Sequence, residues 1–124
     1  MIYGIGIDLV EIKRIKKILE RKEKVFLNKI LTIKEMEQYF ILKNTKKIEY
    51  VAGRFAGKEA VSKAVGVGIG AQLGWKDIEI LNSINGSPFV KINKEFSKKN
   101  KLVYHISISH TNELALAEVI IELI

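Results

Sequence analysis

Residues 48–65 read IEYVAGRFAGKEAVSKAV, and this stretch decides the fold. At about 100° per residue it carries an apolar stripe, which predicts a long helix with one buried face. The stripe consists of Ile48, Val51, Ala52 and Phe55. Glu59 falls inside it, about 40° from Phe55, and Ser62 lies at about −20°. A buried carboxylate is costly without a partner, so Glu59 requires a cation, a hydrogen-bond network or a proton.

Lys63 stands one turn after Glu59 and leaves two interpretations open. For an isolated E-x-x-x-K, an ordinary ion pair along the helix is the simpler one. The other is that both side chains serve a site on the face that should meet the core.

The N-terminal residues predict a strand that bears a carboxylate. Residues 3–9 alternate, with Ile5, Ile7 and Leu9 on one face and Gly4, Gly6 and Asp8 on the other, as in a half-buried strand. Asp8 should therefore stand on a face cleared by glycines. A helix is expected from Glu11 onward, with Asp8 and Glu11 resembling a capping box.

The remaining elements predict an α+β fold. Thr32 with Glu35 indicates a second helix start, running to about Leu42, and a basic loop should follow over 43–47. Two hairpins are expected after the long helix. Their arms are 75–81 with 89–92, and 102–109 with 114–121. The expected architecture is a mostly antiparallel sheet with an N-terminal strand, central helices and two C-terminal hairpins, in a single domain over 1–124.

Composition narrows the function classes. The chain has 124 residues, 48% of them hydrophobic, enough for one core. It has no cysteine, which excludes disulfides, thiolate metal sites and a cysteine nucleophile and suits a cytosolic protein. The apolar run 114–124 is interrupted by Glu118 and Glu122 and is far shorter than the roughly 20 residues of a membrane span. The net charge of +7 favours an anionic partner.

Ser109 and His110 do not form a hydrolase pair. On an extended strand neighbouring side chains point to opposite faces, so these two diverge. Taken alone, His110 is more simply a satisfied residue at a strand end.

Three motifs in order along the chain resemble the bacterial holo-[acyl-carrier-protein] synthases of the phosphopantetheinyl transferase superfamily. They are GIGID at 4–8 followed by Glu11 and Arg14, AGRFAGKEA at 52–60 followed by Lys63, and ISISHT at 106–111. The resemblance covers essentially the whole chain. It implies the 4'-phosphopantetheinyl transferase fold, a homotrimer with active sites between subunits, and transfer of phosphopantetheine from coenzyme A to a serine of apo-acyl carrier protein.

The resemblance also implies a catalytic set. Asp8 and Glu59 occupy the positions that hold Mg²⁺ in this family, which suits hard oxygen ligands. Lys63 would meet the pyrophosphate and stabilise the leaving adenosine 3',5'-bisphosphate. Either Glu59 or a water on the cation would accept the serine proton.

Substrate-binding residues follow by the same resemblance. Arg54, His110 and Lys46 of the basic loop resemble the groups that meet the 3'-phosphate and adenosine of coenzyme A. Further positions resemble the lining of the nucleotide pocket, namely Asn85, Gly86, Pro88, Ser109 and Thr111. The basic helix with Arg14, Lys17 and Arg21 resembles the surface that docks the acidic carrier protein.

Two other function classes compete with this one. A nucleic-acid-binding module would account for the charge, but the aromatics are not interleaved with basic residues, and Asp8 and Glu59 would repel phosphate. A metal-dependent phosphohydrolase would use the same Asp, Glu and Lys with water as nucleophile, and only the family resemblance separates it from a transferase.

Overall fold

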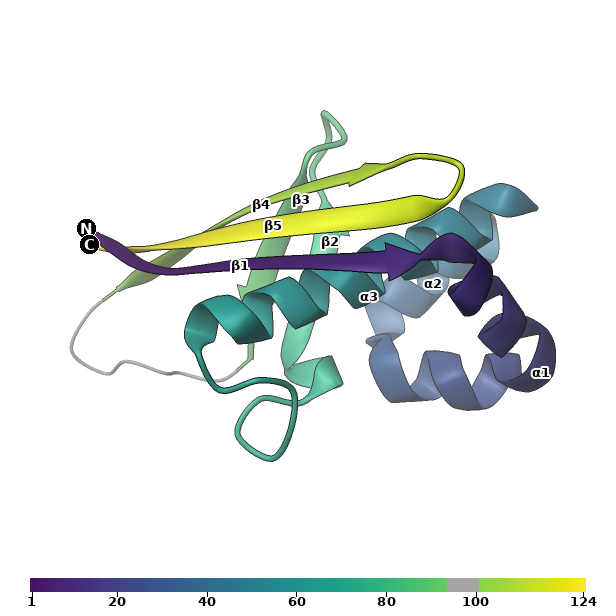
Figure 1. Cartoon of the computed structure of the whole chain (residues 1–124), viewed down its shortest axis with the longest axis horizontal. Coiled ribbons are helices and arrows are strands. Elements are labelled where there is room, and N and C mark those ends of the chain that lie inside the picture. Colours follow the sequence, from purple (N-terminus) through teal and green to yellow (C-terminus); the bar gives the residue numbers. More distant parts are fainter. Residues whose placement is uncertain (94–100) are drawn as a thin grey trace.

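The computed structural model describes residues 1–93 and 101–124 as an α+β fold with two antiparallel sheets (Figure 1). The larger sheet has the order β1-β5-β4, and the smaller is the hairpin β2-β3. The helices are α1 (Ile12–Ile30), α2 (Ile33–Ile41) and α3 (Thr45–Val65). The strands are β1 (Ile2–Glu11), β2 (Ile78–Asn82), β3 (Pro88–Ile92), β4 (Leu102–His110) and β5 (Leu114–Leu123). The predicted strands and helices are all present, although several boundaries differ.

Helix α3 is the centre of the molecule and runs beneath the larger sheet (Figure 1). The predicted stripe is correct, since Val51 and Ala52 are buried while Ile48 and Phe55 pack against the core from its edge. Small residues of the helix, such as Ala56 and Ala60, are also fully buried. They allow a sheet on one side and α1 and β2 on another to approach the helix closely.

The predicted alternation of β1 is confirmed, and the face that carries the glycines and Asp8 is the one turned toward α3. Gly4 and Gly6 face α3, and a Cβ added to either would lie 1.9 Å from a carbonyl oxygen of Ala64 or Ala60. Ile5, Ile7 and Leu9 point outward and are 60%, 53% and 58% exposed. The strand lies so close to the helix backbone that only glycine fits between them, and this forces the larger side chains to the other face.

The predicted capping box of Asp8 and Glu11 is wrong. Strand β1 continues through Glu11, whose side chain makes no capping hydrogen bond. The first turn of α1 is instead joined to the β4–β5 turn, because the amide of Ile12 donates to the carbonyl oxygen of Glu113 at 2.9 Å. Helix α1 has a kink at Lys22 (φ −146°, ψ 48°). Asp8 thus remains a strand residue, free of a capping role.

The second capping box is confirmed, and the loop after α2 is shorter than predicted. The Thr32 hydroxyl accepts from the Glu35 amide at 3.3 Å, while Glu35 Oε1 accepts from the Thr32 amide at 2.8 Å. The predicted basic loop over 43–47 is wrong in extent, because α3 begins at Thr45. Asn44, with a φ of 55°, makes the sharp turn into the helix, so Lys46 lies in the first helical turn.

Both C-terminal hairpins are confirmed. Strand β2 begins at Ile78 rather than Trp75, because Trp75–Asp77 forms a 3₁₀ turn in which Asp77 Oδ2 accepts from the Gly74 amide at 2.7 Å. The turn of the first hairpin contains Gly86 with a φ of 90°. Within the described residues no helix is long and apolar enough to cross a membrane.

Candidate active site

The carboxylate of Asp8 lies between β1 and α3, where the two glycines bring strand and helix together. Lys63 of α3 donates to Asp8 Oδ1 at 3.0 Å and to the carbonyl oxygen of Ile7 at 3.0 Å. The Lys63 side chain is 51% exposed and that of Asp8 is 17% exposed. The ion pair of Lys63 therefore crosses to the strand, and the lysine remains accessible to a ligand.

Glu59 completes this cluster from one turn earlier on α3. Its pKa is raised above that of an ordinary glutamate, first by burial and second by the negative charge of Asp8. Lys63 and Arg14 oppose this rise in the pKa of Glu59. These residues thus form one cluster of four charged groups from β1, α1 and α3. Its two carboxylates, Asp8 and Glu59, repel each other when both are ionised.

The donor set fits a hard divalent cation. The charge of Asp8 contributes to the raised pKa of the neighbouring Glu59, so a shared cation would stabilise this pair of carboxylates, and oxygen ligands are those that Mg²⁺ prefers. Within 1–93 and 101–124 no group of three or more His, Cys, Asp or Glu side chains could hold a metal. Asp8 and Glu59 would therefore supply two ligands, leaving positions for water and for phosphate oxygens of a substrate.

A cavity of about 310 Å³ lies on another side of α3. Its lining includes three of the predicted coenzyme-binding residues, Lys46, Arg54 and His110. His110 Nε2 lies 3.1 Å from Glu49 Oε2, which also lines the cavity. The structure thus brings together side chains from the start of α3 and the end of β4.

Arg54 is buried and held on three sides. Its Nε donates to the carbonyl oxygen of Ile80 at 3.2 Å, and its Nη2 donates to Asn82 Oδ1 at 3.0 Å. The guanidinium carbon lies 4.2 Å from the ring centroid of Tyr50. These contacts orient a buried cation at the edge of the cavity.

The chain is similar throughout its length to enzymes of one superfamily. The family model of the 4'-phosphopantetheinyl transferase superfamily matches residues 4–119. The chain belongs to this superfamily. It is 48% identical over 122 residues to the holo-[acyl-carrier-protein] synthase of Bacillus subtilis (strain 168), covering 98% of this chain and 97% of the relative.

Solved structures of other holo-[acyl-carrier-protein] synthases share the fold of this phosphopantetheinyl transferase. The enzyme of Bacillus anthracis, in complex with CoA (3',5'-ADP), has a TM-score of 0.86 at 44% identity, over 98% of this chain and 96% of that chain. The enzyme of Helicobacter pylori, in complex with coenzyme A, has a TM-score of 0.79 at 35% identity, over 95% of this chain and 99% of that chain.

Other predicted positions of the transferase lie apart from the 310 Å³ cavity. Thr111 lines a second cavity of about 480 Å³, and its hydroxyl accepts from the amides of Glu113 and Leu114 at 3.1 Å each. Ser109 points to the outer face of the sheet, opposite to His110, as alternation predicted. The hairpin residues Asn85, Gly86 and Pro88 lie beyond Asn82, which connects their hairpin to Arg54.

The predicted carrier-binding residues share an exposed stretch of α1. Arg14, Lys17 and Arg21 are all exposed, and their spacing of three and four residues places them on one face of the helix. Arg14 stands at the end next to the Glu59 cluster, since its charge reaches that carboxylate. The basic face of α1 thus begins at the edge of the Asp8 and Glu59 cluster.

Sequence reasoning missed three residues around Arg54. Tyr50 precedes Arg54 by four residues, so helical spacing could have revealed this pair. Helical spacing relates Glu49 only to nearby residues such as 46 and 53, and gives no signal of its contact with His110. Asn82 is 28 residues from Arg54 and carries no local signal of the contact.

Proposed function

We propose that this protein is a holo-[acyl-carrier-protein] synthase, which transfers the 4'-phosphopantetheine of coenzyme A to a serine of apo-acyl carrier protein. The reaction uses a divalent cation, Mg²⁺ or Mn²⁺, held by Asp8 and Glu59. The single observation that carries the site assignment is the cluster of Asp8, Glu59 and Lys63 at the contact of β1 with α3. A cation there would neutralise pyrophosphate charge and draw the phosphate oxygens toward Lys63.

Glu59 and Lys63 have different roles in the transfer reaction. The serine oxygen forms a bond to the β-phosphorus of coenzyme A, and the bond from that phosphorus to the oxygen of adenosine 3',5'-bisphosphate breaks. The carboxylate of Glu59, or a water that the cation would hold, would accept the serine proton. Lys63 stabilises the negative charge that develops on the leaving phosphate, because its ammonium is half exposed and held beside Asp8.

We assign the nucleotide end of coenzyme A to the cavity around Arg54. A buried arginine whose guanidinium faces a cavity offers planar donors to a phosphate. Lys46 and His110 line the same cavity and add further donors. Asn85, Gly86, Pro88, Ser109 and Thr111 remain proposed contacts of the nucleotide.

The acidic carrier protein docks on α1. Arg14, Lys17 and Arg21 present positive charge on an exposed face of α1, whose first turn lies next to Glu59, and the whole chain carries a net charge of +7. Complementary charge raises the encounter rate and weakens with salt. In this arrangement a bound carrier brings its serine to the catalytic cluster.

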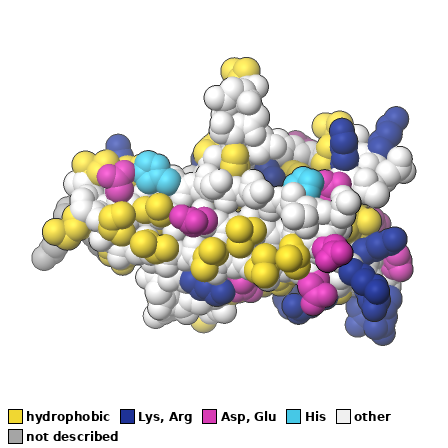
Figure 2. Space-filling model, turned by 45° about the horizontal axis from the view of Figure 1, so that its top comes forward, with side chains coloured by type: hydrophobic (Ala, Val, Ile, Leu, Met, Phe, Trp, Pro, Cys, Tyr) yellow, Lys and Arg dark blue, Asp and Glu magenta, His cyan; other side chains and the backbone are white. Residues whose placement is uncertain are grey.

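We propose further that three copies of the chain, each a single domain in the cytosol, form the working enzyme. The outer face of the larger sheet bears exposed Ile5, Ile7, Leu9 and Leu116, and Figure 2 shows hydrophobic side chains gathered along the molecule. Contiguous apolar surface of this kind is typical of an interface. Arg54 and Glu59 also lie about 140° apart around α3, so one coenzyme can reach both kinds of site more easily between two chains.

Light scattering tests the assembly. We expect a trimer for the wild type and a smaller species for Ile7→Lys, because a charge on the outer face opposes its burial. Ile33→Lys is the control, since Ile33 is exposed on α2, away from the sheet. A wild-type monomer at assay concentration would contradict the shared site.

The intact mass of a carrier protein tests the reaction. Apo-acyl carrier protein is incubated with this protein, coenzyme A and Mg²⁺, beside a control with EDTA. A mass gain of one phosphopantetheine with release of adenosine 3',5'-bisphosphate, lost in EDTA, supports the proposal. Free phosphopantetheine with an unmodified carrier would identify a phosphohydrolase instead.

A further inference from the structure

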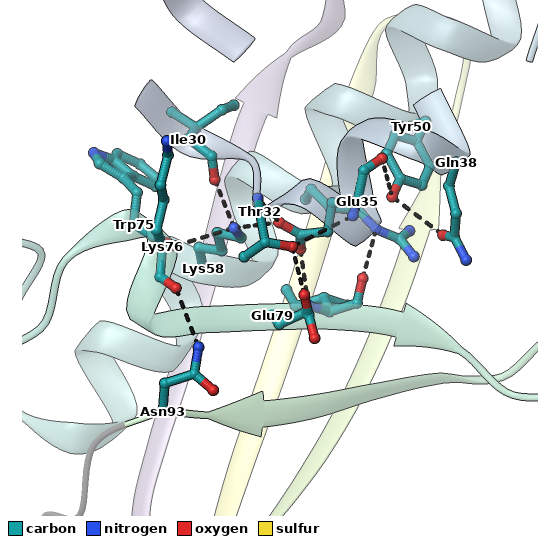
Figure 3. Close-up of polar contacts among 12 residues, drawn as sticks. Ile30, Thr32, Glu35, Gln38, Tyr50, Lys58, Trp75, Lys76, Glu79 and Asn93 are labelled. Carbon is teal, nitrogen blue, oxygen red and sulfur yellow. Dashed lines mark hydrogen bonds and ion pairs between the residues drawn. The ribbon is translucent and has the colours of Figure 1, made fainter. Parts of the chain in front are cut away.

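A buried polar network lies on the side of α3 that faces away from Asp8, and the proposed chemistry does not use it (Figure 3). Its centre is the ion pair of Glu35 and Lys58, with 2.6 Å between Oε1 and Nζ and both side chains fully buried. Glu35 comes from the first turn of α2, and Lys58 directly precedes Glu59 on α3. We call this set the Glu35 network; it comprises Glu35, Lys58, Thr32, Tyr50 and Ile80.

The two charges of the network are fully coordinated. Lys58 Nζ donates to Glu35 Oε1, to the carbonyl oxygen of Ile30 and, at 3.0 Å, to that of Trp75. Glu35 Oε1 also accepts from the Thr32 amide, and Oε2 accepts from the Ile80 amide at 2.8 Å. An ammonium with three acceptors has no donor left for a ligand, so Lys58 is excluded from binding substrate directly.

Two of the three supports of Arg54, Ile80 and Tyr50, lead back to Glu35; the third is Asn82. The carbonyl oxygen of Ile80 accepts from Arg54 Nε, and the amide of the same residue donates to Glu35 Oε2. The Tyr50 ring lies against the guanidinium, and the Tyr50 hydroxyl lies 3.2 Å from each of two acceptors, the main-chain carbonyl oxygen of Glu35 and Gln38 Oε1. The carboxylate of Glu35 therefore fixes a position of β2, and the main chain of α2 at Glu35, together with Gln38, holds the aromatic ring. Ile80 and Tyr50 in turn hold Arg54 on two sides.

Stability alone does not explain a buried ion pair at this place. Replacing such a pair with apolar side chains of similar volume is often neutral or stabilising, because taking two charges out of water is costly. What apolar side chains cannot supply is a directed acceptor for the Ile80 amide. The specific contribution of Glu35 is therefore the position of β2 relative to α3.

We infer that Glu35 is a positioning residue for coenzyme A: its carboxylate holds Arg54 at the cavity through Ile80, and its main-chain carbonyl contributes through Tyr50. This rests on the proposed function, in which Arg54 meets the 3'-phosphate of coenzyme A. The hydrogen bonds to Ile80 and Asn82 use two of the five N–H groups of Arg54, and even with its interaction with the Tyr50 side chain donors remain for that phosphate. Hydrogen bonds from a guanidinium to a phosphate depend strongly on geometry, so a small displacement of Arg54 should weaken the contact with the 3'-phosphate more than other contacts with coenzyme A.

The test compares coenzyme A with 3'-dephospho-coenzyme A as donor, using the ratio of their kcat/KM values. Arg54→Gln should lower this ratio about 10-fold or more, because it removes a hydrogen bond between charged groups. Glu35→Leu with Lys58→Met removes both charges and the acceptor for Ile80, and Tyr50→Phe removes only the hydroxyl. Both should lower the ratio at least about 3-fold while kcat/KM for the dephospho donor stays near wild type.

Two controls isolate the acceptor and the hydroxyl. Glu35→Gln with Lys58→Met removes the charges but keeps an acceptor for the Ile80 amide, so the ratio should stay near wild type. Tyr39→Phe removes another buried tyrosine hydroxyl, which bonds Glu23 at 2.7 Å and has no part in holding Arg54, and it should leave the ratio unchanged.

The outcomes separate the inference from the proposed function. A folded Glu35→Leu, Lys58→Met variant with the wild-type ratio overturns the inference, and so does an equal loss with both donors. If that variant does not fold, Tyr50→Phe tests the link through the aromatic ring, and a wild-type ratio there overturns the inference as stated. A wild-type ratio in Arg54→Gln removes the assignment of Arg54 itself, and the inference with it.

Discussion

Charged side chains are buried and fully hydrogen-bonded on one side of helix α3, and partly exposed on the other. On one side Lys58 and Glu35 are fully buried and their hydrogen bonds are complete. On the other side Lys63 is half exposed, and Glu59 carries a pKa raised by burial and by Asp8. Two lysines five residues apart therefore have different tasks: Lys58 joins secondary-structure elements, and Lys63 is available to a substrate. Complete coordination marks the structural charges, and incomplete coordination marks the reactive ones.

The largest effect should come from removing a carboxylate on the reactive side. Asp8→Ala or Glu59→Ala should lower the rate of transfer by about 10²-fold or more, because each removes a ligand of the cation from a preorganised site. Circular dichroism should be unchanged. Glu37→Ala, on the exposed surface of α2, is the control. Near wild-type rates in both variants would refute the assignment of the metal ligands.

The two lysines give the sharpest contrast. Lys58→Met leaves Glu35 buried without its cation and should lower the free energy of unfolding by about 3–5 kcal/mol. Lys63→Met breaks an exposed pair and should change that free energy by about 1 kcal/mol or less, while the rate falls about 10²-fold. Urea unfolding and initial rates measure both quantities. A stable, active Lys63→Met together with a stable Lys58→Met would erase the distinction between the two sides.

Arg14 tests whether the reactive side continues onto α1. Arg14→Glu should raise the KM for carrier protein about 10-fold and flatten its dependence on salt, because it reverses one charge of the docking face. The KM for coenzyme A should change little. Lys101→Glu, directly before β4, makes the same charge change away from α1. A defect confined to coenzyme A would mean that the carrier docks elsewhere.

The smallest effect concerns stability and its dependence on pH. Because the folded pKa of Glu59 lies above that of an unfolded glutamate, ionising Glu59 opposes folding. This cost is absent below the unfolded pKa, grows as pH rises toward the folded pKa and is complete above it. In EDTA, Glu59→Gln should therefore have a higher Tm than wild type at neutral pH, with the difference vanishing in acid. A lower Tm at neutral pH would show that Glu59 is already well satisfied.

Local patterns predicted much of this structure. The capping box of Thr32 and Glu35 was recognisable because its two residues are three apart, and both hairpins followed from alternation and turn residues. Glu59 stood out because a carboxylate interrupted an apolar stripe. Signals of this kind depend on residues close together in the chain.

One local signal failed, because strand pairing of β1 with β5 continues through Glu11 and overrides the predicted capping box of Asp8 and Glu11. Other features depend on distant partners. The outward direction of Ile5, Ile7 and Leu9 follows from how closely β1 lies on Ala60 and Ala64, which no property of the strand itself reveals. Glu35 was identified as a cap, but its partner Lys58 is 23 residues away. Lys58 also looked like an ordinary polar residue of a basic chain, so the network around it was invisible from sequence.

The central claim is that Asp8 and Glu59 together hold the cation on the reactive side of α3, and binding of Mn²⁺ followed by electron paramagnetic resonance tests it most directly. In the presence of adenosine 3',5'-bisphosphate, the wild type should bind Mn²⁺, and Asp8→Ala and Glu59→Ala should each bind it at least about 10-fold more weakly. Glu37→Ala should bind as the wild type does. Equal affinity in all four proteins would contradict the claim, whatever the rates of transfer.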